Sequence, residues 1–109
     1  MSNSEPKTIA YGIADVEEIL DDVVAERYGE LSPPVIRKYG GRFITAGETV
    51  VAEGRAGKGA YLVIVEFPSM ERAKTWYNST EYAPIRALAP IAFRRRMLFV
   101  EGAKPSTSE

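Results

Sequence analysis

Two acidic residues interrupt apolar stretches of this sequence and are the first candidates for chemistry. The chain has no His and no Cys, so acid–base work falls to Asp, Glu, Tyr, Lys and Arg. Asp15 and Glu66 sit among apolar neighbours, where loss of water raises the proton affinity of a carboxylate. In one interpretation Glu66, ahead of Asp15, is a catalytic base in a pocket, and Arg42 holds a substrate carboxylate or enolate. In the other, both carboxylates form structural ion pairs with Arg42 or with the arginines at 94–96.

Four aromatic residues could form the flat walls that bind ring-shaped ligands. They are Tyr11, Trp76, Tyr77 and Tyr82, and each tyrosine adds a polar hydroxyl to an apolar surface. Trp76 and Tyr77 also have the spacing of residues on one helix face, which is equally typical of a packed core. Substrate binding and core packing therefore both stay open for these residues.

The composition excludes several classes of active site. A chain without His and Cys cannot build a zinc hydrolase, a His-ligated haem site or a Ser-His-Asp triad. The loop Arg55–Gly59 carries two glycines and two cations, but an apolar strand follows it where a phosphate-binding loop needs a helix. We therefore predict that no metal, haem, flavin or nicotinamide cofactor is intrinsic to the protein.

Charge and hydropathy limit the partners and the location. The 109 residues carry a formal net charge of -1, which gives no long-range attraction for nucleic acid or an anionic membrane. No apolar run approaches the roughly 18 residues of a membrane span, and the first six residues lack the pattern of a signal peptide. We expect a cytoplasmic protein with neither partner. Residues 1–6 and 103–109 are polar and are predicted to be disordered tails around one domain, 7–102.

The first half of the chain predicts a strand, a helix and a hairpin. Alternating apolar residues predict a strand over 8–16. Asp21 and Asp22 can cap a helix that reaches about Glu30, after which Pro33-Pro34 breaks or restarts it. Short aromatic and β-branched runs at 42–46 and 48–53, separated by Gly47, predict a hairpin.

The second half predicts a central strand, a helical region and a final strand. Residues 61–67 are apolar at nearly every position, which is typical of a strand covered on both faces. Ser69 can cap a helix, a second helical segment begins at Ser79 or Thr80, and Pro90 ends or kinks it. A last strand is predicted at 97–101. The order β-α-β-β-α-β predicts an α+β ferredoxin-like fold, with a four-stranded antiparallel sheet and helices on one face.

Several motifs occur together along residues 9–102 and carry a family resemblance. They are Pro33-Pro34, Tyr39-Gly40-Gly41-Arg42-Phe43, Glu66-Phe67-Pro68-Ser69, Trp76-Tyr77-Asn78-Ser79 and Glu81-Tyr82. In these motifs the chain resembles the family called domain of unknown function 1330, of the dimeric α+β barrel superfamily. The resemblance implies a homodimer whose two sheets face each other, with a small cleft in each subunit between sheet and helices. Many relatives have an aromatic residue where this chain has Gly12, and the smaller residue would enlarge a substrate pocket.

Two classes of function remain after these exclusions. By resemblance to superfamily relatives, the first is a cofactor-independent enzyme that acts on a small aromatic, polyketide-like or acidic metabolite. Its chemistry would be acid–base enolisation of the isomerase, cyclase or lyase type, with the oxyanion held by Arg42 and a tyrosine hydroxyl. The second is a non-catalytic protein that binds a small molecule or acts as a dimeric interaction module.

Overall fold

The computed structural model describes residues 8–103, which form one layer of helices on one sheet. The elements in chain order are β1 (Ala10–Ile19), α1 (Asp22–Lys38), β2 (Arg42–Glu48), β3 (Tyr61–Phe67), α2 (Met70–Tyr77), α3 (Ala83–Arg86), α4 (Ala89–Ala92) and β4 (Phe93–Glu101). The predicted tails lie outside the described residues, apart from Ala103.

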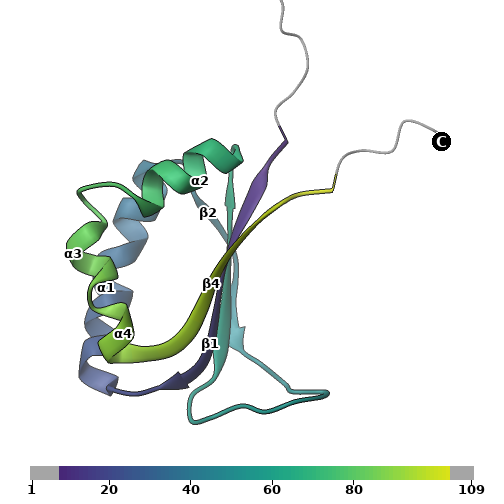
Figure 1. Cartoon of the computed structure of the whole chain (residues 1–109), viewed down its shortest axis with the longest axis vertical. Coiled ribbons are helices and arrows are strands. Elements are labelled where there is room, and N and C mark those ends of the chain that lie inside the picture. The colour runs from purple at the N-terminus through teal and green to yellow at the C-terminus, as the bar shows by residue number, and fades with distance from the viewer. Residues whose placement is uncertain (1–7, 104–109) are drawn as a thin grey trace, which may run out of the picture.

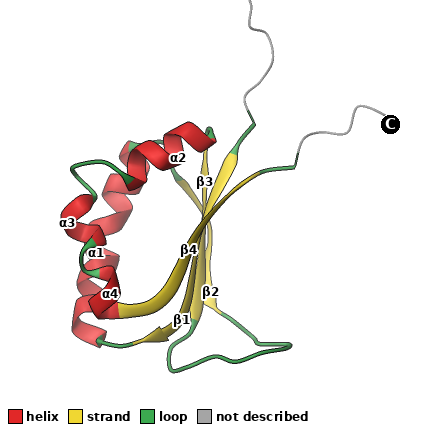
Figure 2. Ribbon diagram, viewed as in Figure 1, coloured by secondary structure: helices red, strands yellow, loops and turns green. Residues whose placement is uncertain are grey.

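The four strands form an antiparallel sheet in the order β2-β3-β1-β4, with β3 and β1 in the centre. The four helices of residues 8–103 lie on the same side of this sheet, and no element in that range covers the opposite side (Figure 1, Figure 2). The predicted α+β ferredoxin-like fold is therefore confirmed. We call the side that packs on the helices the inner face, and the uncovered side the outer face.

Alternation along β1 assigns its residues to the two faces. Ala10, Gly12, Ala14 and Val16 are buried on the inner face, whereas the residues between them are half-buried. The small inner residues of β1 leave room for larger side chains from the helices and from β3. On the outer face, Ile13 lies opposite Ile64 of β3 and Leu98 of β4, which makes an apolar row across the sheet.

Helix α1 runs without a break from Asp22 to Lys38, so the predicted interruption at Pro33-Pro34 is wrong. Two prolines remove two backbone hydrogen bonds, each worth about 0.5–1.5 kcal/mol. Tyr28 and Ile36 of the same helix are buried against the sheet, and burying one large side chain stabilises the folded state by about 1.5–3 kcal/mol. Tertiary packing therefore outweighs the local preference of proline. Gly40 ends the helix in the left-handed region at φ 89°.

Other boundaries differ from the prediction, including the end of β1 at Ile19 instead of residue 16 and the start of α3 at Ala83 instead of residue 79 or 80. Residues 49–60 form no strand, because β2 already ends at Glu48 and its hairpin partner is Tyr61–Phe67. Pro90 lies in the first turn of α4 instead of ending a helix, since its missing N–H is not needed there. Strand β4 begins at Phe93, four residues before the predicted start at 97, because the arginines at 94–96 pair with β1. These arginines are therefore part of the sheet.

The core lies between the helices and the inner face. Phe67 and Trp76 stack with ring centroids 5.5 Å apart, and the ring centroids of Trp76 and Tyr82 are 4.4 Å apart.

Among the described residues, no helix has the length and apolar character needed to cross a membrane.

Candidate functional site

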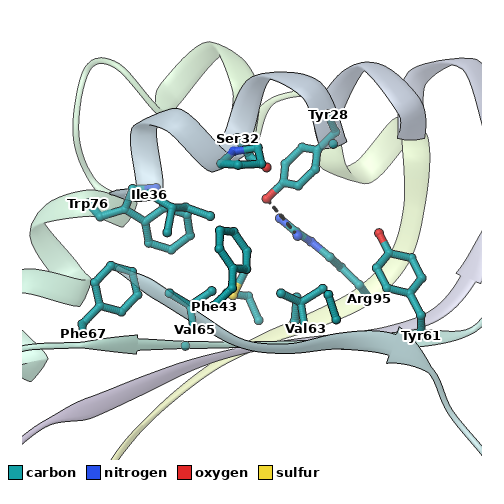
Figure 3. Close-up of a pocket in the computed structure, with 16 residues that line it drawn as sticks. Tyr28, Ser32, Ile36, Phe43, Tyr61, Val63, Val65, Phe67, Trp76 and Arg95 are labelled. Carbon is teal, nitrogen blue, oxygen red and sulfur yellow. Dashed lines mark hydrogen bonds between the residues drawn. The ribbon is translucent and has the colours of Figure 1, made fainter. Parts of the chain in front are cut away.

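A cavity of about 210 Å³ lies between α1 and the inner face of the sheet. An apolar cavity of about 150 Å³ is sufficient to hold benzene, so this one can take a single substituted ring. Its apolar walls include Ile36, Phe43, Val63, Val65, Phe67 and Trp76. Polar groups are few, and Figure 3 shows Arg95, Tyr28 and Tyr61 together at one end and Trp76 and Phe67 at the other. The cavity therefore has a polar end and an aromatic end.

Three residues from distant parts of the chain form a hydrogen-bonded network at the polar end. Arg95, from β4, donates from Nη1 to the Tyr28 hydroxyl at 3.1 Å and from Nη2 to the Tyr82 hydroxyl at 3.2 Å. The two hydroxyl groups also share a short hydrogen bond with each other. The Arg95 guanidinium lies 4.8 Å from the centroid of the Tyr28 ring, close enough for a cation–π contact.

Arg95 is a half-buried cation that has no acidic partner in residues 8–103. The ion pairs of this region join other residues, including the two neighbouring arginines: Arg94 pairs with Glu18 at 2.7 Å and Arg96 with Asp15 at 3.3 Å. Burial by itself lowers the pKa of Arg95, but the Tyr28 and Tyr82 hydroxyl groups offset this and hold its pKa above the ordinary value. The polar end therefore carries a permanent positive charge.

Tyr61 and Tyr82, both near Arg95, have raised pKa values and stay protonated at neutral pH. Burial is the main cause of the raised pKa of Tyr82, and the adjacent Tyr28 hydroxyl raises it further. Burial also raises the pKa of Tyr61, although the charge of Arg95 partly opposes the shift. Both groups are therefore hydrogen-bond donors or acceptors in this site and are not bases. The arrangement favours an anion at the polar end.

One of the two α1 prolines, Pro33, is part of the cavity wall. Ser32 is 5% exposed and lines the cavity together with Gly29 and Pro33. Pro33 has no amide hydrogen, so the Gly29 carbonyl cannot receive the usual helical hydrogen bond from the residue four positions later. In residues 8–103 no hydrogen bond of the Ser32 hydroxyl is found, which leaves it available to a ligand.

The aromatic end is closed by tight packing. A Cβ atom added to Gly12 would lie 3.3 Å from both Phe67 Cε2 and Phe99 Cε1, so a larger residue would displace these rings. Trp76 is 2% exposed, and its indole N–H has no hydrogen-bond partner in the described part of the chain. Gly12 and Trp76 both line the cavity, as the substrate-binding prediction requires.

The predicted catalytic residues lie on the other side of the sheet. Glu66 is on the outer face and accepts a hydrogen bond of 2.8 Å from Arg42, which lies opposite it on β2. Asp15 pairs with Arg96 across β1 and β4, also on the outer face. This differs from the expected pocket position, because side chains alternate along a strand and the cavity lies on the inner face. These are the ion pairs that the alternative interpretation of Glu66 and Asp15 predicts, in which both carboxylates are structural.

The predicted aromatic residues are divided between several environments. Tyr11 is on the outer face, opposite Glu66, and does not reach the cavity. Tyr82 is fully buried and contacts the polar end through its hydroxyl. Tyr77 contacts Trp76 and Phe99 in the core and lines a second cavity. Gly12 and Trp76 therefore line the cavity, and Tyr82 reaches its polar end through Arg95. Tyr77 contacts Trp76 and Tyr82 without lining the cavity, and Tyr11 lies on the opposite face of the sheet.

Sequence reasoning missed Arg95 and Tyr28, the two residues that define the polar end. In the sequence Arg95 is one of three arginines that could pair with Asp15 or Glu66, and only the strand alternation of residues 93–97 separates it from Arg94 and Arg96. Tyr28 had only its helical spacing as a clue.

Within residues 8–103, no three His, Cys, Asp or Glu residues come together in a group that could hold a metal ion.

A comparison with protein families assigns this fold and sequence to one of them. The family model described as Domain of unknown function (DUF1330) matches residues 9–103. The chain belongs to this family. The resemblance noted in the motifs is thereby confirmed, and membership carries no established reaction with it. No curated protein matches the chain.

Solved structures share the fold at low sequence identity. A protein of unknown function from Rhodopseudomonas palustris has a TM-score of 0.71 at 17% identity, over 94% of this chain and 88% of that one. SnoaB, a cofactor-independent oxygenase from Streptomyces nogalater, has a TM-score of 0.58 at 8% identity, over 96% and 100%. A dimeric protein of unknown function with a ferredoxin-like fold, from Bacteroides fragilis, has a TM-score of 0.58 at 13% identity, over 86% and 96%.

Proposed function

We propose that this DUF1330 protein is a cofactor-independent enzyme for a small phenolic or enolisable molecule, which it holds as an oxyanion in the cavity beneath α1. The observation that carries the proposal is Arg95, a half-buried cation without a carboxylate partner in residues 8–103, at one end of an apolar cavity. A cation in such a site stabilises negative charge more strongly than it would in water. The fold shared with the cofactor-independent oxygenase SnoaB is compatible with this chemistry.

Hydrogen-bond accounting gives Tyr28 a donor role in this proposal. One of the two tyrosine hydrogens lies in the bond between Tyr28 and Tyr82. Tyr82 is fully buried whereas Tyr28 lines the cavity, so no hydrogen is left buried and unpaired if Tyr82 donates to Tyr28. The Tyr28 hydroxyl then accepts from Arg95 and Tyr82 and keeps its own hydrogen for the ligand oxygen. The hydrogen bonds that the Tyr28 hydroxyl accepts from Arg95 and Tyr82 polarise it, and this strengthens the bond that it donates to the ligand oxygen.

The proton of the ligand leaves to solvent in this mechanism. Among the described residues no Asp or Glu lines the cavity, so a ligand acidic enough to ionise once its anion is stabilised is required. Phenols and 1,3-dicarbonyl compounds meet this condition. The reaction classes that pass through such an anion include isomerisation, cyclisation and carbon–carbon cleavage. Deprotonation by Glu66 would need a cavity on the outer face.

The test uses 4-nitrophenol, whose phenolate absorbs visible light, so that the pKa of the bound probe can be measured directly. Wild-type protein is expected to lower the pKa of bound 4-nitrophenol and to quench the fluorescence of Trp76, the single tryptophan in the chain. Arg95→Gln should weaken phenolate binding by about 10- to 100-fold, the range for loss of a charge-assisted hydrogen bond. Arg96→Gln is the matched control, because it changes the adjacent arginine, whose side chain lies on the outer face. Equal binding by wild type and Arg95→Gln would refute the oxyanion site.

The alternative function is a non-catalytic protein that binds the same anion, and the lack of a carboxylate in the cavity favours it. Hydrogen–deuterium exchange at the central carbon of acetylacetone separates the two. An enzyme that stabilises the enolate accelerates this exchange, and Arg95→Gln removes about 10²–10³ of the acceleration. Binding without accelerated exchange assigns the protein to the second class.

We also propose that two copies associate through their outer faces. Nothing in the described part of the chain covers the apolar row of Ile13, Ile64 and Leu98, and Leu98 is 40% exposed. A sheet with one uncovered apolar face gains stability when a second sheet packs on it. The dimeric protein from Bacteroides fragilis shares the fold, which supports the association of two copies.

A further inference from the structure

A second cavity, of about 500 Å³, lies on the other side of Arg95. It is bounded by α3, α4, the end of α2 and strand β4, and it shares Arg95 and Met97 with the first cavity. Its basic residues are Arg86, Arg94 and Arg95. No acidic residue lines it within residues 8–103. We call this second space the arginine cleft.

Arg86 is held in place from two directions. Its Nη1 donates to the backbone carbonyl of Tyr77 at 2.8 Å, and its guanidinium lies 5.0 Å from the centroid of the Tyr77 ring. A guanidinium that is already held in place loses little further conformational entropy when it binds a ligand. Arg86 has hydrogen-bond donors left, because its bond to the Tyr77 carbonyl uses only one of its N–H groups.

The charges of the arginine cleft are not balanced from within the described part of the chain. Arg94 pairs with Glu18, whereas neither Arg86 nor Arg95 has a carboxylate within ion-pair distance there. Two uncompensated guanidinium groups therefore line one cleft. Planar guanidinium groups match the oxygens of carboxylate and phosphate in geometry as well as in charge.

We infer that the arginine cleft binds a small oxyanion, a carboxylate or phosphate group, and that its occupancy weakens anion binding in the first cavity. The coupling rests on the proposed function, because it requires an oxyanion beside Arg95. An anion on each side of the same guanidinium repels the other across a partly buried wall. At a separation of about 8 Å and an effective dielectric constant of about 40, this repulsion lowers affinity about fivefold.

Binding to the cleft is tested first, with inorganic phosphate and with acetate as separate titrants, by isothermal titration at constant ionic strength. Wild type is expected to bind at least one of them, and Arg86→Gln to bind at least tenfold more weakly. Arg86→Lys keeps the charge and should retain part of the affinity. Arg72→Gln is the matched control, because Arg72 also donates to a backbone carbonyl, that of Tyr39, but lies outside the cleft.

The outcomes separate this inference from the proposed function. If neither titrant binds the wild type, or if Arg86→Gln binds as the wild type does, the cleft is not an anion site. The coupling is then tested by titrating 4-nitrophenolate with and without saturating titrant, where wild type should lose about fivefold and Arg86→Gln should not. An unchanged phenolate affinity in the wild type refutes the coupling. Absence of phenolate binding under all conditions refutes the proposed function and leaves the phosphate and acetate result standing.

Discussion

One step along a strand separates three adjacent arginines into different roles. Arg94 and Arg96 reach carboxylates of β1, whereas Arg95 turns to the inner face and meets two tyrosine hydroxyl groups. An exposed ion pair contributes little, with a median of about 0–1 kcal/mol. A half-buried cation beside an apolar cavity has stronger electrostatic effects, because the surroundings screen it less. Of these three arginines, Arg95 is therefore the one best placed to stabilise a bound anion.

Glu66→Gln tests the residue that the sequence favoured as a base. Glu66 pairs with Arg42 on the outer face, so the substitution removes an ion pair and leaves the cavity unchanged. We expect the free energy of unfolding to change by less than about 1 kcal/mol and phenolate binding to equal that of the wild type. Urea unfolding and the 4-nitrophenol titration measure the two effects. A large loss of binding or turnover in Glu66→Gln would return the catalytic role to the outer face.

The Tyr82 hydroxyl predicts a loss of stability in alkali. Its pKa in the folded protein is raised above the ordinary value of 10.0, so folding favours the protonated form. The stabilisation is complete below pH 10.0 and is lost as pH rises toward the folded pKa, with a slope of up to about 1.4 kcal/mol per pH unit. Tyr82→Phe should show a shallower fall of the free energy of unfolding above pH 10.0 in urea unfolding. An identical slope in variant and wild type would contradict the assignment.

At the scale of elements, α1 forms one wall of the site because the helix continues through its two prolines. Ser32 and Pro33 line the cavity, and Tyr28 reaches Arg95 from the same helix one turn earlier. Gly41 lets the following strand pass close beneath the helix, since a Cβ atom there would lie 2.5 Å from Ile36 Cγ2. The close approach of α1 and β2 therefore depends on a residue without a side chain.

Pro34→Ala tests whether the prolines cost stability. Pro34 is exposed and does not line the cavity, so the substitution restores a helical N–H without removing packing. We expect the free energy of unfolding to rise by about 1–2 kcal/mol, after allowing for the more flexible unfolded chain. Pro84→Ala is the control, because Pro84 lies in the first turn of α3, where no N–H is needed. Lower stability of Pro34→Ala in urea unfolding would mean that the prolines rigidify α1 favourably.

At the scale of the whole molecule, the sheet has one face for the site and one for assembly. Helices cover the inner face (Figure 1), and the cavity lies between them and the sheet. The outer face presents an apolar row bordered by two cross-strand ion pairs. The ion pairs set the polar margins of that face. A partner sheet would bury the apolar row between them.

Leu98→Asp tests this assembly. Leu98 is 40% exposed in a single chain, so a charge there is compatible with the folded subunit but is unfavourable in a buried interface. We expect wild type to sediment as a dimer at micromolar concentration and Leu98→Asp as a monomer. Val23→Asp changes a 75% exposed valine on α1, on the helical side, and should remain dimeric. A dimeric Leu98→Asp would place the interface elsewhere.

The sequence by itself determined the family, the α+β ferredoxin-like fold class and the lack of any His or Cys side chain for chemistry. These follow from local information: apolar periodicity, capping residues such as Ser69, and the lack of His and Cys. Local information also predicted that Gly12 and Trp76 could belong to a pocket. It could not predict that α1 continues through Pro33-Pro34, because that outcome depends on side chains buried against a distant sheet.

Only the tertiary structure decided which residues share a site. Tyr28, Tyr82 and Arg95 come from α1, the turn before α3, and β4, and no spacing in the sequence relates them. Glu66 and Arg42 satisfy the same sequence criteria as pocket residues, but the pleat turns them to the outer face. A cavity is the space left between packed layers, and its position depends on where every neighbouring element lies. The charge that is left unpaired at its wall is therefore a property of the fold.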